Sequence, residues 1–205
     1  MELKNFKALR VGLDVCPIAN EIASQPEAWF QQTGRQNVRV QAEALAIPLR
    51  GIRKSKIGDR ARRDVHETRY TTISGAFPAA RAFIEAIASE VGGALGRAKI
   101  VNLPAGRKVH AHVDRGEYYA RRDRYHLVIE SRGCRMRAGD EEVVMRPGEL
   151  WWFDNKAEHE AWNETDAPRI HLIFDVEPMR RAEEAAAESL APRGPARSGS
   201  EPGSL

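Results

Sequence analysis

One segment of the chain has the hydrophobic spacing of an amphipathic helix. Within Pro78–Val91, apolar residues recur at intervals that place them on one helix face, namely Phe83, Ile84, Ile87 and Val91. The proline suits a first helical turn, and the glycine pair at 92–93 suits a helix end. We therefore predict a helix here that packs against a core.

The N-terminal third has a mixed pattern. Residues 17–32 are predicted to be helical, with a break near Pro26, where proline interrupts the backbone hydrogen bonds. Residues 38–49 and 70–73 have extended patterns instead.

From Lys99 onward, short apolar runs alternate with turn signals such as Pro147-Gly148. The predicted strands are Lys99–Leu103, Val109–Val113, Tyr125–Glu130, Cys134–Arg137, Glu142–Met145, Glu149–Phe153, His159–Asn163 and Arg169–Val176. Many short strands in succession predict a jelly roll or another double-sheet barrel, with the helix packed outside. The interior of such a barrel has room for one small ligand.

Length and composition favour a single domain. The chain has 205 residues, of which 42% are hydrophobic and 30% charged. We predict one domain over 1–178, with a mixed helical part at 1–98 and the barrel at 99–178, followed by an unstructured Ala-, Arg-, Pro- and Gly-rich tail at 179–205. No apolar run is long enough for a membrane span, so the expected location is cytoplasmic, without a membrane partner.

The charge balance speaks against a nucleic-acid partner, because 32 basic residues face 29 acidic ones. The charge is unevenly distributed, since residues 50–69 hold eight basic and three acidic side chains. We interpret this stretch as solvated loops; alternatively, Arg60, Arg62 and Arg63 help to form the entrance for a carboxylate-bearing substrate.

Two cysteines, Cys16 and Cys134, are too few and too far apart for a zinc cage or a disulfide scaffold. We expect both to be reduced, buried residues. Trp151, Trp152, Phe153 and Trp162 are likewise expected to be core residues rather than walls of a binding site.

Histidines cluster in the strand-rich half, which contains five of the six. His112 and Asp114 are two positions apart, so on an extended backbone they point to the same side. His159, on a distant predicted strand, is the best third ligand. Two imidazoles and a carboxylate on one side of a metal leave neighbouring positions open, as in non-haem Fe(II) oxygenases.

Basic residues share faces on two predicted strands: Arg124 with His126, and Arg169 with His171. Charges that face a barrel interior are costly unless they are paired. A bound polyanion or a core salt bridge satisfies this requirement, and Arg169 in particular offers a planar fork for a carboxylate.

The segments Leu103–Asp114, Arg124–Ile129, Trp152–Asn163 and Arg169–Asp175 resemble the aspartyl/asparaginyl beta-hydroxylase family. The most specific features are the block Phe-Asp-x-x-x-x-His-Glu-x-Trp-Asn and the arginine that stands ten residues after its histidine.

This resemblance implies an Fe(II)- and 2-oxoglutarate-dependent dioxygenase on a double-stranded beta-helix, a cupin-like barrel. It assigns His112 and His159 to iron and to catalysis, Arg169 to the distal carboxylate of 2-oxoglutarate, and Arg124 and His126 to holding the co-substrate near the metal. Asp114 is a departure from the animal aspartyl hydroxylases, which lack a carboxylate ligand, and it would complete the metal and catalytic set as in bacterial members of the family. The enzyme is expected to use O2 to hydroxylate an unactivated carbon, the beta carbon in particular, releasing succinate and CO2. The implied substrate is an amino acid or an acidic residue in a short peptide.

Two other interpretations remain open. His110, His112, Glu117 and His159 partly match the metal ligands of cupins that act without 2-oxoglutarate, such as isomerases or small-molecule-binding modules. A metal-free interaction protein that keeps only the barrel is the third possibility.

Overall fold

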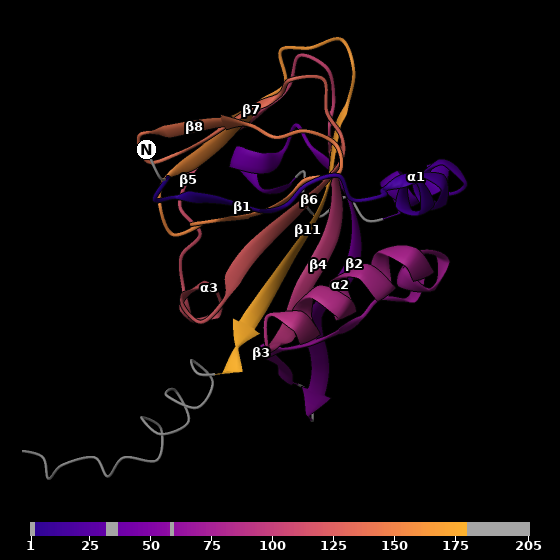
Figure 1. Ribbon diagram of the computed structural model, residues 1–205. Coiled ribbons are helices and arrows are strands. Elements are labelled where there is room, and N and C mark those ends of the chain that lie inside the picture. The colour runs from indigo at the N-terminus through magenta and orange to yellow at the C-terminus, as the bar shows by residue number, and fades with distance from the viewer. Residues whose placement is uncertain (1–2, 32–36, 58–59, 180–205) are drawn as a thin grey trace, which may run out of the picture.

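Strands predominate in the protein, which the computed structural model describes over residues 3–31, 37–57 and 60–179 (Figure 1). Apart from Met179, the predicted tail at 179–205 lies outside these ranges, as do the side chains of Arg60, Arg62 and Arg63. None of the described helices is both long and apolar enough to cross a membrane.

The strands are β1 (Phe6–Arg10), β2 (Leu45–Ile57), β3 (Arg60–Tyr70), β4 (Gly93–Leu103), β5 (Lys108–His112), β6 (Asp123–Glu130), β7 (Arg135–Ala138), β8 (Glu141–Val144), β9 (Leu150–Phe153), β10 (His159–Trp162) and β11 (Arg169–Pro178). The α-helices are α1 (Cys16–Ala23), α2 (Pro78–Glu90) and α3 (Glu117–Ala120). Short 3-10 helices are η1 (Pro26–Phe30), η3 (Arg39–Gln41) and η4 (Thr72–Ala76).

Two antiparallel sheets face each other across the interior. The larger has the strand order β1-β9-β6-β11-β4-β2-β3, and the smaller has the order β5-β10-β7-β8. Figure 1 shows the smaller sheet above the larger one, with α1 and α2 together at one side. This is a mainly β, jelly-roll-like fold with flanking helices, as the strand pattern predicts.

The central strands β6 and β11 of the larger sheet are buried on both faces, which explains the nearly continuous apolar runs within them. On the outer face, Ile100, Leu172 and Phe174 pack with Ile84 and Ile87 of α2. On the inner face, a second cluster fills the space toward the smaller sheet. It contains Val101, Leu103, Val128, Ile173, Val109, Met136 and Ala161. The site described below lies on this inner side.

The structure confirms the helix at α2 and the strands β4 to β11, with shifts of a few residues at their ends. The extended interpretation of 38–49 is wrong for its first part, because η3 precedes a strand that begins only at Leu45. The interpretation of 70–73 is also wrong, since β3 ends at Tyr70 and η4 follows. Both errors lie in short segments where tertiary contacts outweigh local propensity.

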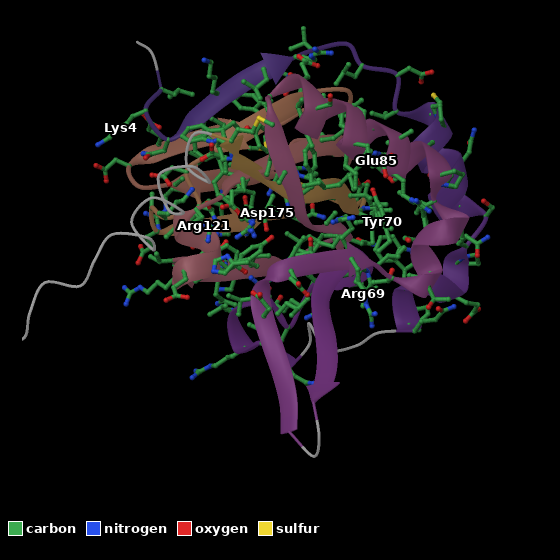
Figure 2. All side chains as sticks on the ribbon, turned by 90° about the horizontal axis from the view of Figure 1, so that it is seen from below. Lys4, Arg69, Tyr70, Glu85, Arg121 and Asp175 are labelled. Atoms are coloured by element: carbon green, nitrogen blue, oxygen red, sulfur yellow. The ribbon has the colours of Figure 1, made fainter. Side chains whose placement is uncertain are left out.

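The stretch 50–69, interpreted as solvated loops, forms most of the hairpin β2–β3. Pairing of β2 with β4, from Leu45 opposite Asn102 to Arg50 opposite Ala98, extends the larger sheet and sets this hairpin at its edge. Figure 2 shows the hairpin projecting from the body of the molecule. Charged side chains are common on such edges because they discourage pairing with another chain.

The expectation for the cysteines is confirmed for Cys134, which is buried, and is wrong for Cys16, which is exposed. Cys16 begins α1, whose buried face consists of Ile18 and Ile22, so the thiol lies on the other side of the helix.

Candidate metal centre

The smaller sheet places His112 and His159 opposite each other. His112 ends β5 and His159 begins β10, and the two residues are cross-strand partners. Their ring centroids are 4.3 Å apart. The pairing register therefore joins two histidines that are far apart in the sequence.

Hydrogen bonds orient both rings in the same manner. Nδ1 of His112 donates to the carbonyl oxygen of His110 at 2.7 Å, and Nδ1 of His159 donates to that of Ala157 at 3.0 Å. Nε2 is thus the nitrogen with a free lone pair in each neutral ring. On His112, this lone pair accepts a hydrogen bond from the Gln41 amide at 3.2 Å.

Asp114 is fixed by polar contacts just beyond the end of β5. Its backbone N–H donates to the carbonyl oxygen of Asn155 at 3.1 Å, and the Asn155 side chain donates to Oδ2 of Asp114 at 3.0 Å. Arg124 forms an ion pair with the same carboxylate. Burial by itself raises the pKa of Asp114, but the charge of Arg124 and the Asn155 hydrogen bond outweigh it, so the pKa lies below its ordinary value.

His112, Asp114 and His159 form a group whose ligand atoms all lie within 4.8 Å of one another. Bonds of about 2.1 Å to nitrogen and oxygen put neighbouring ligand atoms of one ion about 3 Å apart, so small side-chain movements suffice to close this group around a metal. The donor set, two neutral imidazoles and one carboxylate, suits a first-row transition ion.

A cavity between the sheets adjoins this group. Its lining residues are Gln41, Lys99, Val101, Val109, His112, Arg124, His126, Met136, Phe153, His159, Glu160, Ala161, Arg169 and Ile173. Phe153 thus serves both the core and the cavity wall. The wall combines apolar residues with basic side chains, as binding sites for small anions do.

Arg169 lies in this cavity without a counter-ion. It is 4% exposed, and no carboxylate of the described residues pairs with it. Its guanidinium contacts the thioether sulfur of Met136 at 3.7 Å, and a thioether is a weak acceptor. Burial lowers its pKa to about 10, which still leaves the group charged at neutral pH. A buried, uncompensated cation beside a cavity indicates an anionic ligand.

The comparison with known families agrees with this geometry. A family model described as aspartyl/asparaginyl beta-hydroxylase matches residues 64–178, which is more than half of the chain. The chain belongs to the aspartyl/asparaginyl beta-hydroxylase family. The matched residues 64–178 include the three candidate metal ligands and Arg169.

Several solved structures are similar to part of this chain. A predicted oxalate decarboxylase from Thermotoga maritima is 15% identical, covering 45% of this chain and 72% of that one, with a TM-score of 0.34. A cupin domain of an Enterobacter cloacae transcriptional regulator is 16% identical, covering 40% and 81%, with a TM-score of 0.34. A cupin-superfamily sugar phosphate isomerase from Silicibacter pomeroyi is 23% identical, covering 40% and 50%, with a TM-score of 0.32.

Arg124, unlike Arg169, is paired with carboxylates. Its Nε donates to Asp175 at 2.8 Å and its Nη2 at 3.2 Å, while Nη1 pairs with Asp114. Tyr118 also donates to Asp175, at 3.1 Å, and Asp175 is buried. Two carboxylates therefore neutralise Arg124, and its direct contact with a co-substrate stays a prediction.

Sequence reasoning missed three residues of this site. Asn155 and Asp175 belong to the family segments, and the spacing of Asp175 from Arg169 places both on one face of β11, which was the available signal. Gln41 precedes β2 in a polar stretch outside the match and gave no signal.

The ligand set of the alternative cupin interpretation is not assembled. His110 is exposed and pairs with Glu43 at 3.0 Å. Glu117 is 88% exposed and lies 3.9 Å from His66. Within the described part of the chain, the residues clustered so that they could hold a metal ion are instead His112, Asp114 and His159.

Acid should destabilise the metal-free protein through His159. Burial lowers the pKa of His159 from 6.5 to about 4, so the unfolded chain binds this proton first as the pH falls. Above about pH 6.5, His159 is neutral in both the folded and the unfolded state and costs no stability. As the pH falls toward 4, protonation of His159 in the unfolded chain lowers the free energy of unfolding by about 3 kcal/mol. Urea titrations in EDTA across this range measure the loss. His159→Gln should show a smaller decline, and equal slopes for both proteins would contradict the assignment.

Proposed function

We propose that this protein is an Fe(II)- and 2-oxoglutarate-dependent hydroxylase that acts on an unactivated carbon, the beta carbon of an amino acid or aminoacyl residue. The reaction consumes the substrate C–H bond, O2 and 2-oxoglutarate, and it yields the C–OH product, succinate and CO2. The observation that carries this proposal is a three-residue metal-binding group and an uncompensated buried arginine at one cavity.

His112, Asp114 and His159 would hold the metal. Their one negative charge and two neutral nitrogens leave a divalent ion with net positive charge, which favours an anionic co-substrate beside it. When bound, Fe(II) supplies the activation of dioxygen.

Arg169 would bind the distal carboxylate of 2-oxoglutarate. Its planar guanidinium forms two parallel hydrogen bonds with a carboxylate, and the ion pair forms in surroundings that exclude water. His126, also in the cavity wall, would add a hydrogen bond to the co-substrate. This arrangement fixes the orientation of the co-substrate before the reaction begins.

Arg124 would orient the metal ligand Asp114. Held by Asp175 on one side, it presents Nη1 to the Asp114 carboxylate, while Asn155 donates to the same oxygen. The carboxylate thus stays ionised and its direction is fixed, as contacts behind metal ligands commonly ensure.

The substrate would approach from the side of Gln41, whose amide lies next to Nε2 of His112. Gln41 stands outside the matched region, in the part of the chain that carries none of the candidate ligands. A role of the basic stretch 50–69 in admitting a carboxylate-bearing substrate stays a prediction, because the side chains of Arg60, Arg62 and Arg63 lie outside the described residues.

Binding and turnover of the purified protein test the proposal. Under anaerobic conditions with Fe(II) or Mn(II), 2-oxoglutarate at about 100 times its Kd should add about 2.7 kcal/mol to the free energy of unfolding, and the melting temperature should rise. Under air, screening amino acids and short peptides should reveal substrate-dependent succinate release. A protein that binds neither metal nor 2-oxoglutarate would contradict the proposal.

A further inference from the structure

Two buried histidines contact each other behind the cavity. His126 on β6 lines the cavity and is 4% exposed, whereas His171 on β11 is fully buried. Their Nδ1 atoms lie 3.3 Å apart, with the ring planes at 81°. None of the roles assigned above uses His171.

The strand register explains this contact. His126 is the cross-strand partner of Ile173 in the β11–β6 pair. His171 lies two positions from Ile173 along β11, so both histidines and Arg169 point to the inner side of the larger sheet.

The short distance between the nitrogens means that one ring donates a proton to the other. Charging both rings would place two cations side by side in a buried region that already contains Arg169, so the pair shares its protons as two neutral imidazoles. In one arrangement, His171 donates from Nδ1 and His126 carries its own proton on Nε2. In the other, His126 donates and His171 carries a proton on Nε2.

The surroundings favour donation by His171. Nε2 of His171 is buried and has no hydrogen-bond partner in the described structure, and the same holds for Nε2 of His126. A buried N–H without an acceptor is costlier than a bare ring nitrogen, so Nε2 of His171 is better left unprotonated. The Nε2–H of His126 can donate to a bound anion, because His126 and Arg169 line the same cavity and the charge of Arg169 favours an anion there.

We propose that His171 is a positioning residue that holds His126 in the Nε2–H tautomer and so makes it a hydrogen-bond donor to a carboxylate of 2-oxoglutarate. This inference rests on the proposed function. It assigns His171 an effect on co-substrate affinity, with no effect on the binding of the metal.

Two substitutions at this position separate donation from packing. His171→Leu removes the donor, whereas His171→Asn keeps an N–H close to the place of Nδ1. We expect the Kd for 2-oxoglutarate of the Mn(II)-loaded protein, measured by calorimetry, to rise about 10-fold or more in His171→Leu, because a hydrogen bond to a charged group is lost. In His171→Asn it should stay within about 3-fold of the original. The Kd for Mn(II) should not change in either variant.

Nitrogen-15 spectra of the histidine side chains report the tautomer directly. In the original protein with Zn(II) and 2-oxoglutarate, His126 should show a protonated Nε2 and a bare Nδ1. A protonated Nδ1 there would overturn the inference, even if His171→Leu did not fold. Unchanged 2-oxoglutarate affinity in a folded His171→Leu would overturn it as well and leave the proposed function standing. If the original metal-loaded protein failed to bind 2-oxoglutarate, both would fall.

Discussion

Alanine at His112, Asp114 or His159 should lower substrate-dependent succinate formation by at least about 100-fold, since loss of groups that merely support a metal ligand costs about 10- to 100-fold. The fold should persist, because the three residues lie at strand ends and Arg124 keeps Asp175 as a partner when Asp114 is absent. Succinate release and the Kd for Mn(II) should change together.

A conservative variant and a neighbouring control sharpen this test. Asp114→Asn keeps the shape and the contact with Asn155 but removes the charge that faces the metal, and it should lose activity nearly as strongly as alanine. His110→Ala alters an exposed histidine two positions from His112 and should keep activity. Full turnover in Asp114→Ala or His159→Ala would reject the metal site, whereas activity lost only in His110→Ala would favour the cupin ligand set.

Replacement of Arg169 by methionine should have opposite effects on stability and on co-substrate use. Burial lowers the Arg169 pKa from 12.5 to about 10, which corresponds to a cost of about 3 kcal/mol for the buried charge at neutral pH. Methionine fills much of the same space without charge, so the ligand-free protein should be more stable, as with other buried charges replaced by apolar residues. Urea unfolding in EDTA measures this gain.

The same substitution should raise the KM for 2-oxoglutarate by about 30-fold or more, because truncating one partner of a buried ion pair costs about 2–5 kcal/mol. Arg135→Met is the matched control, since Arg135 is exposed and pairs with Glu142 and Glu164 at the surface. It should change neither KM nor stability by much. An unchanged KM in Arg169→Met would remove Arg169 from the site.

Much of the site follows from strand periodicity. Residues two apart on an extended backbone share a face, so the sequence places His112 with Asp114, Arg124 with His126, and Arg169 with His171. The structure agrees in each case, because these residues lie on or next to β5, β6 and β11. The helix α2 was equally predictable from the sequence, since Ile84 and Ile87 are buried at the predicted spacing.

The partners of the charged residues could not be predicted from the sequence. Arg124 and Arg169 have similar sequence contexts, each two positions before a histidine. In the structure, Arg124 is neutralised by Asp114 and Asp175, whereas Arg169 faces Met136 and the cavity. Only the packing of β11 between β6 and β4 decides which arginine remains for a ligand.

The sequence by itself determined the strand-rich barrel, the faces on which polar residues gather, and the family. The tertiary structure decided that His112 lies opposite His159, that Gln41 reaches the same group, and that His171 contacts His126. The physical reason is that alternation along a strand is a local property, whereas the register between strands is set by burial across both sheets. The candidate metal ligands are therefore brought together by pairing between distant strands, which no short segment of the sequence encodes.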